Sequence, residues 1–330
     1  MRNFTFKGLL LTAVFMLLGC LSIQAANDDL ITKQITINLD KAGTLPDRIA
    51  SSKKYKITNL KIVGEINGTD WNMIREMAGR NYQESSTEGN LSVLDLSEAK
   101  IVAGGDYYYD DNLFNNKVYT SNDEIGEYAF AYCSGLTSLT LPVGITSIGE
   151  FAFSGCSGLT SLTLPAGITS IGEYAFSGCS RLTSLNLPAG ITSIDKYAFS
   201  GCSRLTSLTL PAGITSIGEF AFSYCSGLTS IYVYAEKVPR IGRYAFEGCA
   251  SRKCTLYVPK GTYDNYRLSE FGYFENIVEF DATGIDKTTT STDVEEVSRY
   301  SLNGQRLAVP VKGLNIVKYS DGTVRKVVVK

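Results

Sequence analysis

A 23-residue unit repeats through the middle of this 330-residue chain and constrains its fold more than any other feature. Four near-identical copies and two degraded ones begin at Ile125, Ile148, Ile171, Ile194, Ile217 and Ile241. A fixed period in this range is the signature of a solenoid, because one unit cannot bury its apolar face without a neighbour. The sequence therefore predicts a stack of coils around one continuous core.

The apolar spacing within a unit predicts a short strand. Leu159, Leu162 and Leu164 form the pattern L-x-x-L-x-L, in which the last two leucines share one face of a strand of period two. Pro165 then ends the strand, because proline cannot donate to the ladder. Equivalent strands of successive units should pair at the inter-strand spacing of about 4.8 Å.

The combined motif L-x-x-L-x-L-P followed by I-x-x-I-G-x-x-A-F-x-x-C resembles the BspA-like leucine-rich repeats of bacterial surface proteins. The resemblance extends over residues 31 to about 280, because the segments on both sides of the repeats are similar to those that cap such arrays. It implies a right-handed, β-rich solenoid of the leucine-rich-repeat class with an α/β N-terminal cap and a small β tail. It also implies a non-catalytic protein of a Bacteroidetes-type bacterium that adheres to host proteins or to other cells.

Composition shifts along the chain predict five segments. They are a signal peptide at 1–25, a cap at 26–90, a solenoid at 91–280 with an insertion at 97–124, a linker at 281–293 and a β tail at 294–330.

The first segment is typical of an export leader. Arg2 and Lys7 precede the apolar run from Leu9 to Leu18, which is too short to span a membrane. Leu17-Leu18-Gly19-Cys20 also resembles a bacterial lipobox, so a lipid anchor at Cys20 is the alternative to free secretion. Either route predicts an extracellular or outer-membrane location.

The last segment predicts two hairpins. Asn303-Gly304 and Asp321-Gly322 are typical turn dipeptides between alternating apolar residues. The tail resembles the C-terminal sorting domains of the type IX secretion route. The alternative is a small β module that packs on the solenoid or trails it.

Composition excludes several kinds of chemistry. The chain has no histidine, so neither a Ser-His-Asp triad nor an imidazole metal site can form. Its net charge of −2 argues against a duplex nucleic-acid partner. An acidic residue recurs once per repeat, at Glu150, Glu173, Asp195 and Glu219. These carboxylates form a line and not the facing pair that a glycosidase needs, so we expect them to be solvated. We also expect no cofactor and no bound metal ion.

Six cysteines follow the same period as the apolar residues. Cys133, Cys156, Cys179, Cys202, Cys225 and Cys249 are separated by 23 or 24 residues. A line of equivalent positions does not converge on one metal ion, so we interpret these thiols as small core fillers. Cys254 lies five residues beyond Cys249, and a local disulfide there is the alternative.

The insertion is the strongest candidate binding element. Tyr107, Tyr108 and Tyr109 lie beside Asp106, Asp110 and Asp111, which gives aromatic surface with polar handles. Inserted loops of solenoids often lie on the binding face. Calcium held by the three aspartates is a weaker hypothesis, and tyrosines folded over the edge of the first repeats are the alternative.

Hydroxyl side chains alternate with the buried leucines and should project outward from the strands. The rows comprise Ser138, Thr140, Ser161, Thr163, Ser184, Asn186, Ser207 and Thr209. They form either a platform for a protein or a glycan, or an exposed sheet face with no partner. Three functions therefore stay open: protein adhesion, glycan binding within a surface polysaccharide system, and a structural spacer.

Overall fold

The structure is a computed structural model that describes residues 30–110 and 116–282 and, within the tail, 296–300, 306–307, 313–319 and 324–329. The leader with Cys20, Asp111, and all but the first two residues of the expected linker lie outside these ranges.

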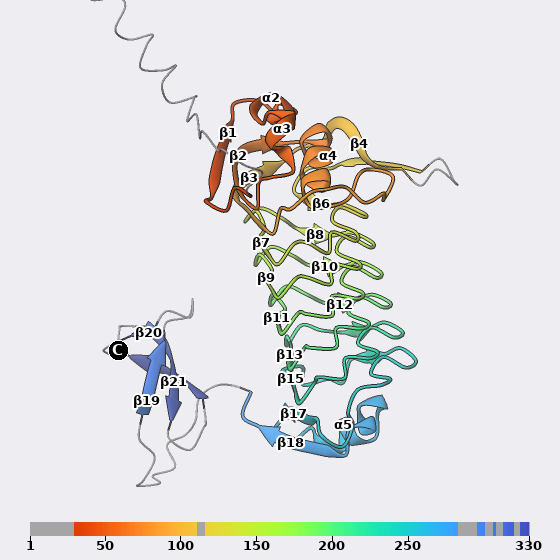
Figure 1. Cartoon of the computed structure of the whole chain (residues 1–330). Helices are drawn as coiled ribbons and strands as arrows, with labels where there is room; N and C mark the ends of the chain where they lie inside the picture. Colours follow the sequence, from red (N-terminus) through yellow and green to blue (C-terminus); the bar gives the residue numbers. More distant parts are fainter. Residues whose placement is uncertain are drawn as a thin grey trace, which may run out of the picture.

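Two parallel sheets run along the stack of coils and make two of its walls (Figure 1). The ten-stranded sheet has the order β1-β2-β3-β7-β9-β11-β13-β15-β17-β18. Its strands are β1 (Ile35–Leu39), β2 (Asn59–Ile66), β3 (Val93–Ile101), β7 (Ser138–Thr140), β9 (Ser161–Thr163), β11 (Ser184–Asn186), β13 (Ser207–Leu210), β15 (Ser230–Val233), β17 (Thr255–Pro259) and β18 (Asn276–Phe280).

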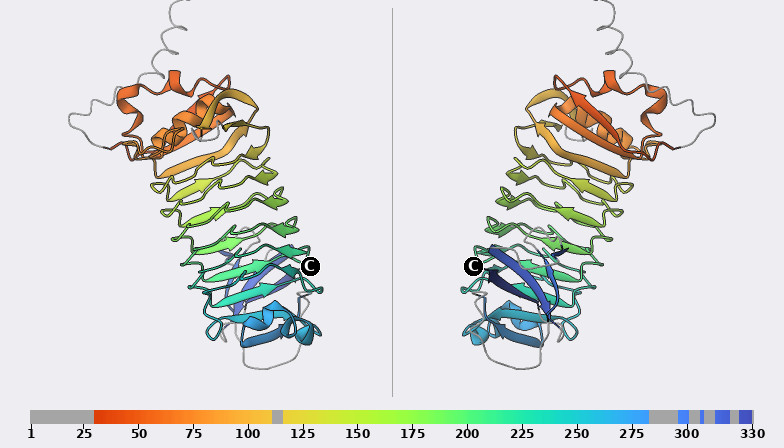
Figure 2. Two further views of the ribbon diagram at one scale, coloured as in Figure 1. Left: turned by 90° about the vertical axis from the view of Figure 1, so that its right-hand side faces the viewer. Right: turned by 90° about the vertical axis from the view of Figure 1, so that its left-hand side faces the viewer.

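The second sheet is narrower because each coil contributes only two residues. Its strands are β6 (Glu124–Ile125), β8 (Ser147–Ile148), β10 (Ser170–Ile171), β12 (Ser193–Ile194), β14 (Ser216–Ile217) and β16 (Arg240–Ile241). Figure 2 shows the coils lying one above another, with each strand beside its counterpart in the next coil. The predicted solenoid is therefore confirmed.

A third wall consists of turns that bond directly to the next coil. The N–H groups of Tyr174, Phe176 and Gly178 donate to carbonyl oxygens of the following coil at 2.9, 2.7 and 2.8 Å. Tyr174 and Gly178 have φ angles of 53° and 73°, in the left-handed region that favours glycine. The stack is thus hydrogen-bonded on all three sides.

Stacked aromatic rings fill the core between these walls. Phe153, Phe176 and Phe199 are fully buried, and their ring centroids lie 4.9 and 5.1 Å apart. Buried leucine, isoleucine, alanine and cysteine side chains of each coil complete the column. Since each buried Leu, Ile or Phe contributes about 1.5–3 kcal/mol of transfer free energy, stacking supplies the stability that one coil lacks.

The N-terminal cap joins the array without a break, because β1, β2 and β3 belong to the ten-stranded sheet. Three helices cover its end: α2 (Leu45–Arg48), α3 (Ser51–Lys54) and α4 (Gly68–Met77). The buried carboxylate of Asp70 accepts hydrogen bonds from the N–H groups of Gly43, Leu45 and Asn67, which ties α4 to α2. This cap and the first coil therefore share one core.

The opposite end of the array is closed by α5 (Tyr263–Arg267) and the 3-10 helix η1 (Glu270–Tyr273). The hydroxyl of buried Tyr266 donates to the Ala235 carbonyl at 2.6 Å. Phe271 and Phe274 pack against Phe246, the last ring of the core column.

The described parts of the tail form a separate antiparallel sheet in the order β20-β19-β21-β22. Its strands are β19 (Glu296–Tyr300), β20 (Arg306–Leu307), β21 (Gly313–Tyr319) and β22 (Val324–Val329). The expected turn dipeptides at 303–304 and 321–322 fall between paired strands but lie outside the described residues.

Candidate functional site

The outward face of the ten-stranded sheet carries two rows of polar side chains in direct register. Ser138 pairs with Ser161, which pairs with Ser184, and Thr140 pairs with Thr163. The leucines between them point inward and are buried, so the polar rows point outward. The rows are Ser138, Ser161, Ser184 and Ser207, and Thr140, Thr163, Asn186 and Thr209. We call this surface the strand face.

The strand face ends on charged residues at its N-terminal side. Lys61, Asp95 and Thr140 occupy the same column in successive strands. The Lys61 ammonium lies 3.6 Å from the Asp95 carboxylate and 2.6 Å from the carboxylate of Glu98. Burial raises the pKa of Asp95, but hydrogen bonds from Ser97 and the charge of Lys61 outweigh it and lower that pKa overall.

Aromatic residues replace the hydroxyls at the C-terminal side. Thr209 pairs with Tyr232, which pairs with Tyr257. The two tyrosine rings are stacked with centroids 4.4 Å apart, and Phe280 meets Tyr232 edge-on at 6.0 Å. Burial, followed by the neighbouring Tyr257, raises the pKa of Tyr232, so the Tyr232 hydroxyl stays protonated at neutral pH. We call Tyr232, Tyr234, Tyr257 and Phe280 the aromatic end.

The aromatic end is absent from the candidate residues predicted above, although the sequence carries a signal for it. In the degraded unit from Ile217, the segment Ile231-Tyr232-Val233-Tyr234 stands where other units have Leu-Thr-Leu-Pro. Aligning this unit to its neighbours puts tyrosine at an outward threonine position.

The insertion forms a hairpin of β4 (Gly104–Asp110) and β5 (Lys117–Thr120). Tyr108 and Tyr109 are buried, with exposed fractions of 1% and 6%. The Tyr108 hydroxyl donates to the Glu127 carbonyl at 2.8 Å, and the Tyr109 ring stacks on Tyr128 at 4.0 Å. The expectation that these two tyrosines offer binding surface is therefore wrong, because they pack in the core between the cap and the first coil.

Tyr107 is the tyrosine of this trio that stays near the surface. Its ring meets Tyr82 at 5.4 Å and Tyr119 at 6.2 Å, and the Lys117 ammonium lies 4.5 Å from its centroid. Tyr119 is half exposed. We call Tyr82, Tyr107, Lys117 and Tyr119 the insertion cluster. Of these four residues, only Tyr107 was predicted from the sequence.

The aspartates of the insertion do not gather around one point. The Asp106 carboxylate accepts a hydrogen bond from the Thr69 hydroxyl at 2.9 Å and so fastens the hairpin to α4. Asp110 lies opposite Lys117 in the hairpin, and Asp111 lies outside the described residues. Among the residues that the structure describes, no group of three or more Cys, Asp or Glu side chains is placed to hold a metal ion.

The cysteine column is part of the packing between coils. Cys156, Cys179 and Cys202 donate their S–H groups to phenylalanine carbonyls of the preceding coil at 3.0, 3.3 and 3.4 Å. Cys249 and Cys254 are both free and buried, so they form no disulfide with each other. Burial raises the pKa of Cys254 to about 11, which keeps it in the unreactive thiol form at neutral pH.

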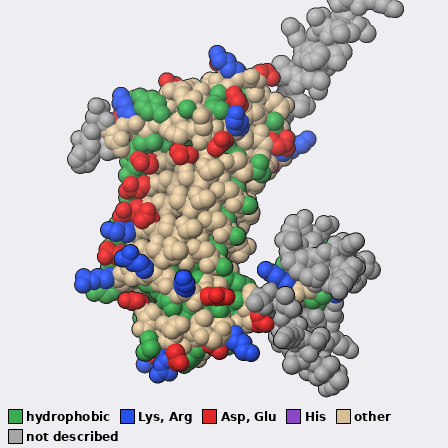
Figure 3. Space-filling model, turned by 180° about the vertical axis from the view of Figure 1, so that it is seen from behind, with side chains coloured by type: hydrophobic (Ala, Val, Ile, Leu, Met, Phe, Trp, Pro, Cys, Tyr) green, Lys and Arg blue, Asp and Glu red, His purple; other side chains and the backbone are tan. Residues whose placement is uncertain are grey.

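The row of carboxylates lies along one edge of the array, but one of its predicted members is misplaced. The Tyr174 N–H donates to the Lys196 carbonyl, just as the Phe151 N–H donates to the Glu173 carbonyl. Lys196 therefore occupies the position in its coil that Glu173 occupies in the coil before. Asp195 takes the position that is glycine in that coil. Burial, then the charges of Glu173 and other neighbours, raise the pKa of Glu150. Figure 3 shows acidic side chains along one edge of the solenoid beside a broad uncharged middle.

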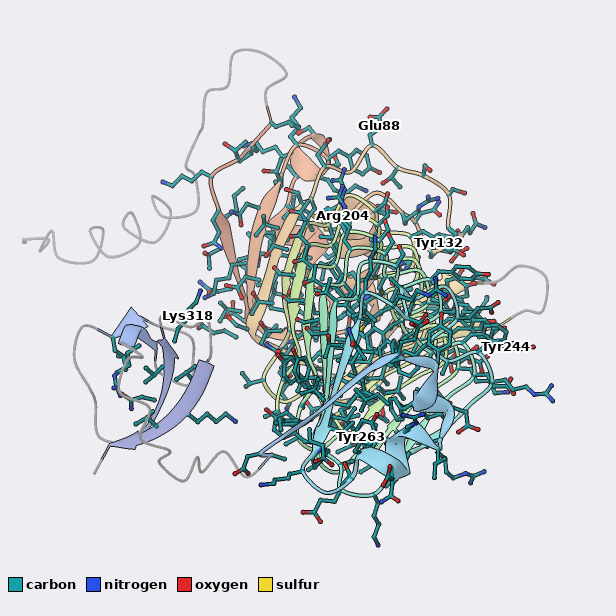
Figure 4. The ribbon with its side chains drawn as sticks, turned by 90° about the horizontal axis from the view of Figure 1, so that it is seen from below. Glu88, Tyr132, Arg204, Tyr244, Tyr263 and Lys318 are labelled. Atoms are coloured by element: carbon teal, nitrogen blue, oxygen red, sulfur yellow. The ribbon has the colours of Figure 1, made fainter. Side chains whose placement is uncertain are left out.

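Exposed tyrosines also project from the turns of the third wall. Tyr132 and Tyr244 lie on the same side of the solenoid (Figure 4), with 43% and 59% of their surface exposed. The guanidinium of Arg80 lies 5.7 Å from the Tyr132 ring centroid. Neither residue lies on the strand face.

The two parallel sheets of short strands, the few helices and the 23-residue period define a β-rich leucine-rich-repeat solenoid. Residues 123–253 match the family model described as BspA type leucine rich repeat region, in six copies. The resemblance stated from the repeat motif is confirmed over this part of the chain.

Solved structures of bacterial leucine-rich-repeat proteins are similar to this chain. The leucine-rich-repeat protein of T. pallidum shares 31% identity over 42% of this chain and 63% of its own, with a TM-score of 0.39. A leucine rich cell surface protein of Faecalibacterium prausnitzii shares 21% over 67% of this chain and 55% of its own, with a TM-score of 0.33. The pneumococcal vaccine antigen PcpA shares 16% over 70% of this chain and 61% of its own, with a TM-score of 0.38.

This chain therefore spans between 55% and 63% of the length of these three proteins. No curated protein matches it. Within the described ranges, none of the helices has the length and hydrophobicity needed to cross a membrane.

Proposed function

We propose that this chain is a non-catalytic binding protein, exported to the surface of a Bacteroidetes-type bacterium or secreted from it, that adheres to host proteins or to other cells. The observation that carries the proposal is the strand face, an outward surface of registered hydroxyl side chains that ends on the aromatic end. The match to the BspA type repeat model supports a surface role.

The strand face supports contact by shape and hydrogen bonding more than by charge. Residues 133–230 contain only seven charged side chains, so long-range steering by the array is weak. The stacked pair Tyr232 and Tyr257 supplies the large, rigid contact area that concentrates binding energy at interfaces. We therefore place the residues that contribute most of the binding energy at the aromatic end. The hydroxyl rows form the polar surface beside it.

The insertion cluster is the second contact region in this proposal. Tyr107 and Tyr119 lie edge to face beside the ammonium of Lys117, which gives an aromatic surface with one positive charge.

Glycan binding is the alternative function, and one observation favours it. The aromatic end adjoins the threonine row directly, since Thr209 and Tyr232 are paired residues. Aromatic surface beside hydroxyl and amide groups is the combination that recognises sugars. A structural spacer is the third hypothesis and predicts no ligand at all.

Export and attachment are part of the same proposal. The leader at 1–25 supplies export, with a lipid anchor at Cys20 as the alternative to release, and the tail at 294–330 acts as a type IX sorting signal.

The test is a binding screen of residues 26–330 against matrix proteins and a glycan array. Deleting the whole insertion would be uninformative, because buried Tyr108 and Tyr109 belong to the core. We would instead compare the double variants Tyr232→Ser/Tyr257→Ser and Tyr107→Ser/Tyr119→Ser with Tyr224→Ser, a matched control whose ring is 59% exposed away from the strand face.

The proposal expects a protein ligand whose affinity falls by about tenfold or more when the aromatic end is changed and is unaffected in the control. Binding to glycans alone would favour the alternative, and no binding to either class would favour the spacer. Loss of affinity only in the insertion double variant would move the site to the insertion cluster.

A further inference from the structure

Both ends of the ten-stranded sheet are open strand edges within the described residues. β1 and β18 are its outermost strands, and each is five residues long. They lie at opposite ends of the stack (Figure 1). An edge strand presents unpaired N–H and C=O groups and is a template for pairing with another chain unless it is blocked.

The two edges match in direction and in side-chain pattern. Every pairing in this sheet is parallel, so a translation along the stack would bring β18 of one copy beside β1 of the next in parallel orientation. Ile35 and Ile37 pair with buried Leu60 and Ile62, and Ile277 pairs with buried Leu256. These inward-facing isoleucines are only partly buried at both ends, so strand pairing with a second copy would bury them further.

Apolar side chains lie exposed among the charged ones at the C-terminal end of the array. Leu268, Tyr273 and Val278 are 86%, 43% and 46% exposed, and they are three of the nine large apolar side chains exposed in the described chain. Glu279, the one charged residue of β18, accepts hydrogen bonds from the N–H groups of Gly261 and Tyr263. Figure 4 shows the molecule from this end, with Tyr263, the first residue of α5, labelled.

The two ends also carry opposite charge. Residues 30–66 contain seven Lys and Arg against three Asp and Glu, a net charge of +4. Two of the seven pair with carboxylates outside this range, Lys54 with Glu76 and Lys61 with Asp95 and Glu98. Residues 255–282 contain two Lys and Arg against five Asp and Glu, a net charge of −3. Complementary charge at the two ends steers association and selects one orientation.

We propose that the C-terminal end of one copy binds the N-terminal end of a second copy, head to tail, with β18 pairing beside β1. Because the contact is heterologous and the ends of the pair remain free, it does not close and yields linear assemblies. This inference goes beyond the binding role proposed above and is independent of it. Assembly would align several strand faces and raise avidity without any new ligand contact.

The test is sedimentation velocity of residues 26–330 over a range of protein and salt concentrations. The proposal expects an average mass that rises with protein concentration and falls with added salt. The variant Leu268→Lys/Val278→Lys should weaken association by about tenfold or more. Val143→Lys is the matched control, because Val143 is 81% exposed in a turn of the interior array. Circular dichroism would verify that each variant is folded.

Mixing two end variants tests the head-to-tail arrangement. Ile35→Lys/Ile37→Lys changes the N-terminal end in β1 and should also weaken self-association. An equimolar mixture with Leu268→Lys/Val278→Lys should form dimers but no larger species, because each dimer then has one usable contact. A monomer at all concentrations, or equal weakening by Val143→Lys, would overturn the proposal. So would a chain that associates only after truncation at residue 282, because the tail would then cover β18.

Discussion

The interior coils and the N-terminal junction bury comparable side chains by different means. In the interior, each residue packs on copies of itself, as Phe176 does on Phe153 and Phe199. At the junction, buried side chains such as Trp71 and Arg75 contact residues of a different kind and not copies of themselves. The Trp71 N–H donates to the Ala129 carbonyl at 2.9 Å, and the guanidinium of Arg75 donates to the same carbonyl at 3.1 Å.

This difference shows what repetition demands of a side chain. An interior residue must be self-complementary along the stack, which suits flat rings and groups that donate to one neighbouring coil and accept from the other. Thr160 illustrates the second kind, since its hydroxyl donates to Thr137 while its own carbonyl accepts from Thr183. A junction residue faces no copy of itself, so large polar side chains such as Trp71 and Arg75 can be buried there with specific acceptors.

The largest expected effect is the loss of a self-stacked ring. Phe176→Ala should lower the free energy of unfolding by about 3–5 kcal/mol, because a fully buried ring is replaced by a cavity between two neighbours. Urea denaturation would measure it, with Tyr224→Ser expected within about 0.5 kcal/mol of the parent. A loss below about 1 kcal/mol would show that the coils collapse around the gap and that self-stacking is not what holds the interior.

The thiols of the array should make stability fall in alkali. Burial raises the pKa of Cys133 and of Cys254 from 9.0 to about 11. The folded chain therefore retains these protons when the unfolded chain loses them, so their contribution is complete below pH 9.0 and declines as the pH rises to about 11. Unfolding titrations across this range should show a shallower decline in Cys133→Ala/Cys254→Ala than in the parent. An equal decline of stability with pH in the variant and the parent would show that these two thiols do not cause the loss in alkali.

The sequence predicted the interior better than the junction for a physical reason. The repeat period shows that Leu139 and Leu162 lie on the core face of their strands. Their neighbours Ser138 and Thr140 could therefore be assigned to the outer face before the structure was known. Tyr108 and Tyr109 could not be assigned, because adjacent residues of one strand normally face opposite sides. Both are buried here, in a hairpin whose register shifts between Gly104 and Tyr109.

A junction contact can be tested by removing one atom. Tyr108→Phe keeps the ring against Trp71 but deletes the hydroxyl that donates to the Glu127 carbonyl. We expect a loss of about 1–2 kcal/mol in the free energy of unfolding, because a carbonyl is left without its partner. Phe176→Tyr is the converse change, since it adds a hydroxyl where the column offers only copies of phenylalanine. An unchanged stability of Tyr108→Phe would mean that water replaces the hydroxyl and that the junction is less specific than described.

The smallest expected effect separates ring stacking from backbone strain within the interior. Tyr174 stacks on Phe151 and Tyr197 at 4.7 and 4.5 Å, yet its φ of 53° costs a residue with a Cβ about 1–2 kcal/mol. Tyr174→Ala loses the stacking and keeps the strain, whereas Tyr174→Gly loses the stacking and removes the strain. Alanine should therefore be the less stable variant, by about 1 kcal/mol, in thermal or urea unfolding. Gly178→Ala, at a φ of 73° in the same coil, should show a similar penalty with no ring involved. If Tyr174→Ala is as stable as Tyr174→Gly or more stable, the left-handed backbone is not strained at this position. The aromatic residues of this row would then be explained by stacking alone.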